Sequence, residues 1–89
     1  MVLNENQIKK LIKNDDWNFN NESIDKNFKF TSYMGGIKFV NEIAELAEQK
    51  NHHPDISIGW CNVNVSITSH DMGGVTNQCV ELANEIDLL

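Results

Sequence analysis

The amino-acid sequence predicts an α+β domain in which a four-stranded antiparallel sheet has helices packed on one face. Residues 17–30 and 56–68 alternate apolar and polar side chains with the period of a strand. Residues 32–50 and 76–89 instead repeat apolar side chains every three or four positions, as one face of a helix does. Pairs of strands separated by helices favour this arrangement. A chain of 89 residues has room for one domain, residues 1–89.

The first half is predicted to contain a short helix followed by a hairpin. Asn4 and Gln7 form a capping-box pattern, which begins a helix that runs to about Lys13. Its predicted buried side chains are Ile8, Leu11 and Ile12. Two strands follow, separated by the turn-forming residues 20–22, and Lys26 is the one polar break in their inward face. The other inward side chains are Trp17, Phe19, Ile24, Phe28 and Phe30.

The central helix is predicted over residues 32–50. Its apolar stripe consists of Tyr33, Ile37, Val40, Ala44 and Ala47, widened by Phe39, Ile43 and Leu46. Gly35 and Gly36 lie near its start, where each is unfavourable by about 1 kcal/mol relative to alanine. Two interpretations are open: a strand approaches the helix closely there, or glycine is simply tolerated near a helix end.

In the second half, Pro54 ends the central helix near Asn51 and leaves the following residues on a loop. The strand alternation changes parity between Trp60 and Cys61, which indicates a bulge or a tight turn at residues 59–62. Residues 69–74 form a loop, and Thr76 is the predicted N-cap of the last helix. The predicted buried side chains of that helix are Cys79, Leu82, Ala83, Ile86 and Leu89.

Composition limits the partners. A formal net charge of −6 opposes binding to nucleic acid or to an anionic membrane surface. No apolar run approaches the roughly 18 residues of a membrane span, and no signal peptide is evident, so we expect a cytoplasmic protein with reduced cysteines. A core this small leaves stability low, and we expect a homodimer or homotetramer, for which the uncovered sheet face is available.

All three histidines fall between positions 52 and 70. A metal site and a proton-transfer site are the alternatives. His52 and His53 share a peptide unit, and the chain lacks the HxH and HxxxH spacings that place two ligands on one face, which weighs against a metal. No G-x-S-x-G motif is present, and Cys79 lies on a helix face, which weighs against nucleophilic catalysis. Acid and base catalysis by imidazole fits best.

Short motifs extend around these histidines over nearly the whole chain. They are residues 28–30, 39–40, 47–48, 51–54, 60, 62–63, 69–71, 73–76, 82–83 and 86–87. The sequence resembles the pterin-4a-carbinolamine dehydratases in this pattern. The most specific part of the resemblance is the spacing from Glu48 to His52, to Trp60 and on to His70.

The resemblance implies that the chain removes water from 4a-hydroxytetrahydropterin to give quinonoid dihydropterin, without metal or cofactor. It implies a catalytic role for His52, His53 and His70, with His52 and His70 at the departing hydroxyl and His53 orienting or accepting a proton. The implied pterin-binding residues are Glu48, Asn51, Thr68, Ser69 and Asp71, together with the three histidines. Glu48 either hydrogen-bonds an imidazole or the pterin, or forms a surface salt bridge. Trp60 either walls the pocket or, as we expect, packs in the core.

One position departs from the resemblance. Where the family usually carries an aspartate three residues after the threonine, this chain has Cys79. An aspartate there would cap the helix and could support a catalytic histidine, whereas a cysteine does neither well. Either activity is lowered or Asp71 substitutes. The alternative function is therefore a weakly active or inactive member that serves as a protein-interaction or dimerisation module.

Overall fold

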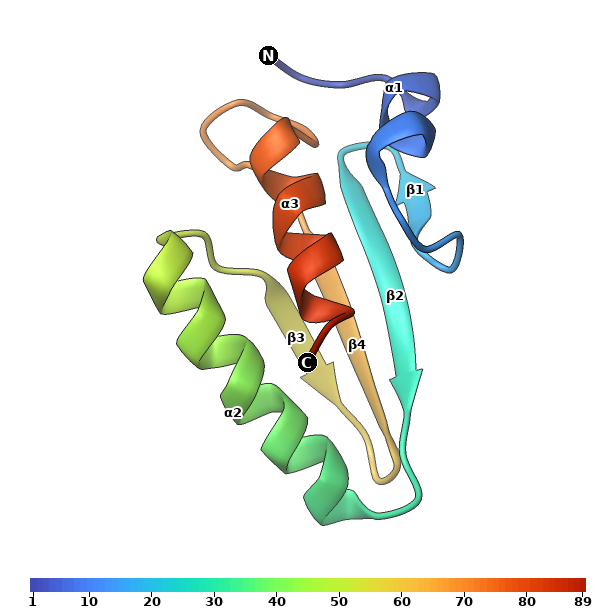
Figure 1. Ribbon diagram of the computed structural model, residues 1–89, viewed down its shortest axis with the longest axis vertical. Coiled ribbons are helices and arrows are strands. Elements are labelled where there is room, and N and C mark those ends of the chain that lie inside the picture. The colour runs from blue at the N-terminus through green and yellow to red at the C-terminus, as the bar shows by residue number, and fades with distance from the viewer.

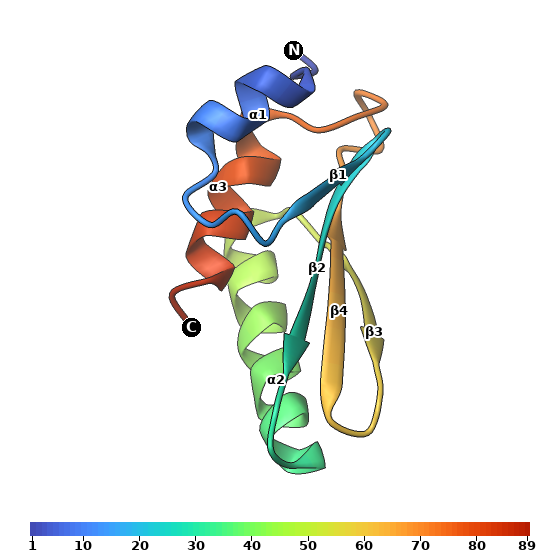
Figure 2. The same ribbon diagram turned by 90° about the vertical axis from the view of Figure 1, so that its right-hand side faces the viewer.

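The computed structural model describes all residues 1–89, and its sheet has helices on one face only (Figure 1, Figure 2). The strand order is β1-β2-β4-β3, and every neighbouring pair is antiparallel. This confirms the predicted α+β class and the order α-β-β-α-β-β-α. The elements are α1 (Glu5–Leu11), β1 (Asn18–Asn20), β2 (Ser23–Lys29), α2 (Tyr33–Lys50), β3 (Asp55–Ile58), β4 (Asn62–Ile67) and α3 (Asn77–Ile86).

The two faces of the sheet differ sharply in chemistry. On the covered face, Ile24 pairs with Ile67 across β2 and β4, and both side chains are fully buried against the helices. The register places only polar side chains on the open face, because successive residues of a strand point to opposite sides. These are Asn18, Asn20, Ser23, Asp25, Asn27, Lys29, Asp55, Ser57, Asn62, Asn64 and Ser66. An apolar open face, which would have favoured an interaction module, is therefore absent.

The structure differs from the prediction in where α1 and α3 end and in which residues of α2 are buried. α1 stops at Leu11, which is exposed, because Ile12 already has extended backbone angles. α3 stops at Ile86, so Leu89 is exposed rather than buried. The buried stripe of α2 is Gly36, Phe39, Ile43 and Ala47, whereas Tyr33 and Ala44, which were predicted to be buried, are exposed. Phe39 and Ile43, which were predicted at the edge of the stripe, are buried together with Ala47 from the predicted stripe itself.

Of the two interpretations left open for the glycines near the start of α2, the close strand holds at Gly36. A Cβ atom built on it would lie 3.3 Å from Cγ2 of Val63 on β4, so the strand does approach the helix there. At the same end, the Gly59 N–H donates to the Asn62 carbonyl at 2.8 Å and closes a tight turn rather than a bulge. Trp60 lies in this turn and is 80% exposed, so the prediction that it packs in the core was wrong.

One ion pair joins the last turns of the two long helices. Nζ of Lys50 lies 2.6 Å from the Glu85 carboxylate, and the hydrogen bond that the ammonium donates to that carboxylate raises the pKa of Lys50. Both side chains are more than a third exposed, so solvent screens the pair and its effect on stability is small. The apolar core fixes the packing of α2 and α3. No helix is long and apolar enough to span a membrane.

Candidate functional site

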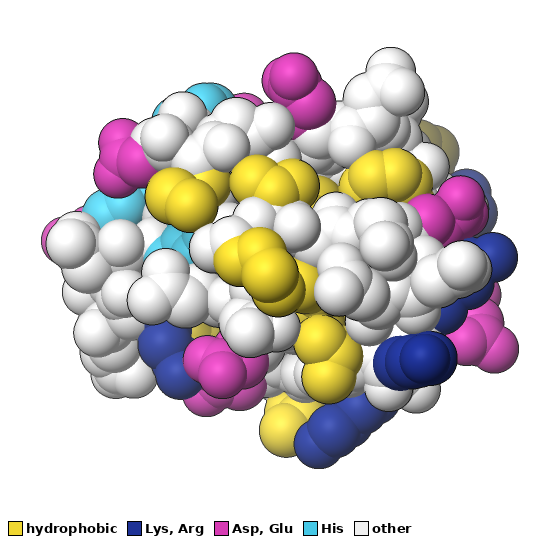
Figure 3. Space-filling model, turned by 90° about the horizontal axis from the view of Figure 1, so that it is seen from above, with side chains coloured by type: hydrophobic (Ala, Val, Ile, Leu, Met, Phe, Trp, Pro, Cys, Tyr) yellow, Lys and Arg dark blue, Asp and Glu magenta, His cyan; other side chains and the backbone are white.

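Four chain segments meet at one end of the sheet, where α2 and β4 end and β3 and α3 begin (Figure 1). Seen from above, the histidine side chains gather on one side of this end (Figure 3). A cavity of about 240 Å³ lies between the segments. None of its lining residues is hydrophobic, and they are Asn51, His52, His53, Thr68, Ser69, His70, Asp71 and Gln78.

The end of α2 directs two histidines into this region. Asn51 has left-handed backbone angles (φ 50°, ψ 42°), a conformation that asparagine tolerates better than most residues. The His52 N–H donates to the Ala47 carbonyl at 3.1 Å, and Pro54 cannot continue a helix. The chain therefore turns off the helix at Asn51, and His52 and His53 lie between α2 and β3.

His52 has the most defined ring. Its Nε2 atom lies 3.1 Å from the Thr68 carbonyl oxygen, which can only accept a hydrogen bond. Nε2 therefore carries the proton in this contact, and in the neutral ring Nδ1 is left as an acceptor. The ring is half-buried, so its orientation is held by protein contacts rather than by solvent.

His53 and His70 are both exposed, and each is held differently. Nε2 of His53 forms a short contact with the Glu48 carboxylate, so Glu48 does hydrogen-bond an imidazole, although it does not line the cavity. His70 follows the end of β4, where Ser69 bridges to Gly74 across a tight loop. The Gly73 N–H donates to the Ser69 carbonyl at 2.8 Å, and Gly73 has φ 75°, which suits glycine.

Cys79 occupies the place beside His52. Its side chain is fully buried, and Sγ lies 3.6 Å from Nε2 of His52 and 3.5 Å from Oγ1 of Thr76. The residue that departs from the family pattern thus contacts a predicted catalytic imidazole directly. Thr76 is the N-cap of α3 but makes no side-chain capping bond, because its hydroxyl faces this thiol.

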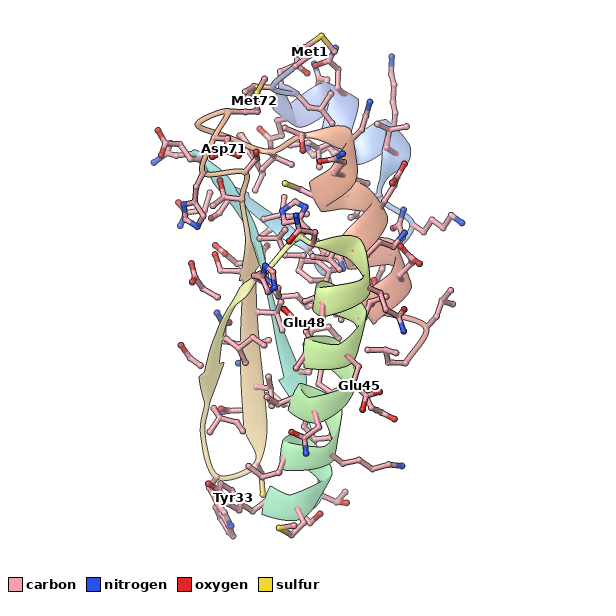
Figure 4. All side chains as sticks on the ribbon, turned by 90° about the vertical axis from the view of Figure 1, so that its left-hand side faces the viewer. Met1, Tyr33, Glu45, Glu48, Asp71 and Met72 are labelled. Carbon is pink, nitrogen blue, oxygen red and sulfur yellow. The ribbon has the colours of Figure 1, made fainter.

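Asp71 does not take over the contact with His52. It lies in the loop beyond β4, whereas Glu48 is near the end of α2 (Figure 4). It lines the cavity and is exposed, and it makes no hydrogen bond or ion pair with a histidine. No three His, Cys, Asp or Glu side chains come close enough together to hold a metal ion.

The cavity unites almost every residue that the sequence indicated. His52, His53, His70, Asn51, Thr68, Ser69 and Asp71 all line it. Gln78 was missed. It lies in the first turn of α3, one residue before Cys79, and that adjacency was the only available signal. Trp60 is in the β3–β4 turn and does not line the cavity.

The fold and the site define a small α+β protein with a polar, histidine-lined cavity at one end of its sheet. The sequence profile of the family described as pterin 4 alpha carbinolamine dehydratase matches residues 1–89. The chain therefore belongs to the pterin 4 alpha carbinolamine dehydratase family.

Two relatives illustrate the similarity, and both carry the name "Putative pterin-4-alpha-carbinolamine dehydratase". The protein of Thermosynechococcus vestitus is 41% identical over 73 residues, which cover 82% of this chain and 77% of the relative. The protein of Sulfurisphaera tokodaii is 39% identical over 88 residues, which cover 98% of this chain and 95% of the relative.

Two solved structures share the fold. A transcriptional coactivator/pterin dehydratase from Brucella melitensis is 26% identical, with a TM-score of 0.89 over 99% of this chain and 97% of that one. A pterin dehydratase-like protein described as a RuBisCO assembly factor in the α-carboxysome is 24% identical, with a TM-score of 0.71 over 82% of this chain and 87% of that one. The second likeness concerns the fold alone.

Proposed function

We propose that this protein dehydrates 4a-hydroxytetrahydropterin to quinonoid dihydropterin by histidine acid and base catalysis. The observation that carries the proposal is that all three histidines of the chain line one polar cavity. The family membership supports the same reaction. An imidazole is suited to it because its protonation state changes near neutral pH.

The reaction needs two proton transfers. The C4a–O bond breaks as an electron pair from the ring nitrogen system forms the new double bond, and the hydroxyl leaves as water once it is protonated. The ring nitrogen system then loses a proton. We assign protonation of the departing hydroxyl to His52 and His70, and substrate orientation or proton acceptance to His53. The Glu48 carboxylate contacts Nε2 of His53 and so holds the ring in place for that role. Asn51, Thr68, Ser69 and Asp71 supply hydrogen bonds to the pterin ring.

The test is a direct assay of the wild-type protein with chemically generated 4a-hydroxytetrahydropterin. General acid and base catalysis is expected to accelerate dehydration by about 10²- to 10⁴-fold over the same buffer without protein. Loss of the 4a-hydroxy species is followed spectroscopically at several protein concentrations. A rate independent of protein concentration would overturn the proposed enzymatic activity and favour an interaction role.

The oligomeric state, expected to be a homodimer or homotetramer, also stays a prediction.

Cys79→Asp is expected to shift the pH dependence of this activity. A carboxylate beside Nε2 of His52 would stabilise the imidazolium, so the pH of half-maximal rate should move upward by about one unit. Rate measurements from pH 5 to 9 would show this shift. Cys61→Ser, in the distant β3–β4 turn, is the matched control and should leave the profile unchanged. An unchanged profile in Cys79→Asp would mean that the side chain at this position does not influence the histidine.

A further inference from the structure

The loop that carries His70 is closed on itself at its base. The Ser69 N–H donates to the Gly74 carbonyl at 2.9 Å. The Ser69 carbonyl accepts hydrogen bonds at 3.2, 2.8 and 3.3 Å from the N–H groups of Met72, Gly73 and Gly74. His70 and the three residues after it are exposed, so the loop depends on Ser69 and Gly74 for its position.

The N-terminal segment, residues 1–3, lies against this base (Figure 4). The Leu3 N–H donates to the Val75 carbonyl at 2.7 Å, and the two residues are 4% and 0% exposed. A Cβ atom built on Gly74 would lie 2.7 Å from Cγ1 of Val2, well inside van der Waals contact. Val2 therefore occupies the space that a side chain at position 74 would need.

Ser69 joins this base to two groups of the histidine cavity. The residue before it is Thr68, whose carbonyl lies 3.1 Å from Nε2 of His52, and the residue after it is His70. Because the chain keeps consecutive Cα atoms 3.8 Å apart, a shift of Ser69 moves the backbone on both sides. Residues 1–3 do not line the cavity, so they can influence it only through the base of the loop.

We propose that Val2 and Leu3 are positioning residues for His70. They hold its loop at the histidine cavity through Gly74 and Ser69. This inference rests on the proposed function, which places His70 at the departing hydroxyl. An exposed loop presents a catalytic group reproducibly only where fixed neighbours support it, and a misplacement of about 1 Å can lower a rate by about 10²-fold. Leu3 supplies this support through its backbone and Val2 through its side chain.

The experiment uses two substitutions that compensate each other. In Gly74→Ala the new methyl group overlaps Val2 and displaces the loop, so kcat should fall about tenfold. Val2→Ala alone leaves a gap beside Gly74, and we expect kcat to fall about threefold. The Cβ atoms of two alanines would lie 3.7 Å apart, which is ordinary contact. The double variant should therefore return to within about twofold of the wild-type kcat.

Gly59→Ala is the matched control, because its methyl group would overlap the Asn62 side chain in the turn at the far end of β3. It should lower thermal stability and keep the wild-type kcat. A double variant no faster than Gly74→Ala would overturn the inference and leave the dehydratase intact. If Gly74→Ala does not fold, a double variant slower than Val2→Ala would overturn it instead.

A measurement without substrate separates this inference from the proposed function. The Gly73 N–H donates to the Ser69 carbonyl at 2.8 Å, so its hydrogen exchange, followed by NMR, reports the closure of the loop. Val2→Ala should speed this exchange about fivefold, and the double variant should restore it. If the wild type does not accelerate dehydration, the proposed function falls and the exchange rates decide alone. Equal exchange in the wild type and Val2→Ala would overturn the positioning role.

Discussion

His52→Ala is expected to lower the catalysed rate of dehydration by about 10²-fold or more. His52 is the half-buried histidine of the cavity, and its ring is fixed by the Thr68 carbonyl at 3.1 Å. A group held in this way transfers a proton without first losing rotational freedom, so its removal takes away both the proton and its orientation. Steady-state rates with the chemically generated substrate provide the measurement.

Variants of the other two histidines test whether the three imidazoles contribute unequally to the rate. His70→Ala should also lower the rate by about 10²-fold, because we place His70 at the departing hydroxyl. His53→Ala should lower it less, by about tenfold, because its ring is exposed and is held only by Glu48, itself exposed. Glu48→Gln should resemble His53→Ala if the carboxylate acts through that ring. A His53→Ala rate as low as that of His52→Ala would contradict this division of roles.

A matched variant separates chemistry from structure at His52. His52→Gln keeps an N–H donor that can reach the Thr68 carbonyl but cannot exchange a proton near neutral pH. We expect it to retain the thermal stability of the wild type while it loses activity to the same extent as His52→Ala. An active His52→Gln protein would show that the residue acts only as a donor that positions the loop.

The sequence predicted which residues line the cavity better than it predicted where the helices end. Asn51 and Pro54 determine locally where α2 ends, so the placement of His52 and His53 could be predicted from neighbouring residues. The contact between Cys79 and His52 spans 27 positions and depends on how α3 packs. The resemblance indicated that this position supports a histidine, but it did not identify which one.

The mispredictions have a common physical origin. Trp60 was predicted to pack in the core, yet the tight turn closed by Gly59 and Asn62 places it in solvent. Tyr33 and Ala44 fit an apolar period as well as their neighbours do, and only the position of the sheet decides which stripe of α2 is buried. Periodicity in a helix with apolar residues on several sides does not determine its rotation.

Asp87→Ala is expected to lower the free energy of unfolding by about 2–4 kcal/mol. The Asp87 carboxylate accepts hydrogen bonds from Nζ of Lys26 at 2.7 Å and from Nε1 of Trp17 at 2.8 Å. The side chains of Lys26 and Asp87 are only 11% and 15% exposed, so removal of the carboxylate leaves a largely buried cation and an indole N–H without a partner. Thermal and urea unfolding would measure the loss, and Lys9→Ala, which removes an exposed ion pair with Glu5, should change stability by less than about 0.5 kcal/mol.

The double variant Lys26→Met/Asp87→Leu tests how much the ion pair between Lys26, the polar residue on the inward sheet face, and Asp87 contributes to stability. The Lys26 ammonium lies 4.7 Å from the Phe28 ring centroid, so a methionine at this position would still pack against aromatic neighbours. Replacement of both charges by apolar side chains removes the desolvation penalty together with the attraction, and such exchanges are often neutral or stabilising. We therefore expect the double variant to recover most of the stability lost in Asp87→Ala. Failure to recover would mean that the hydrogen bond to Trp17, which only Asp87 provides, determines how α3 packs on the sheet.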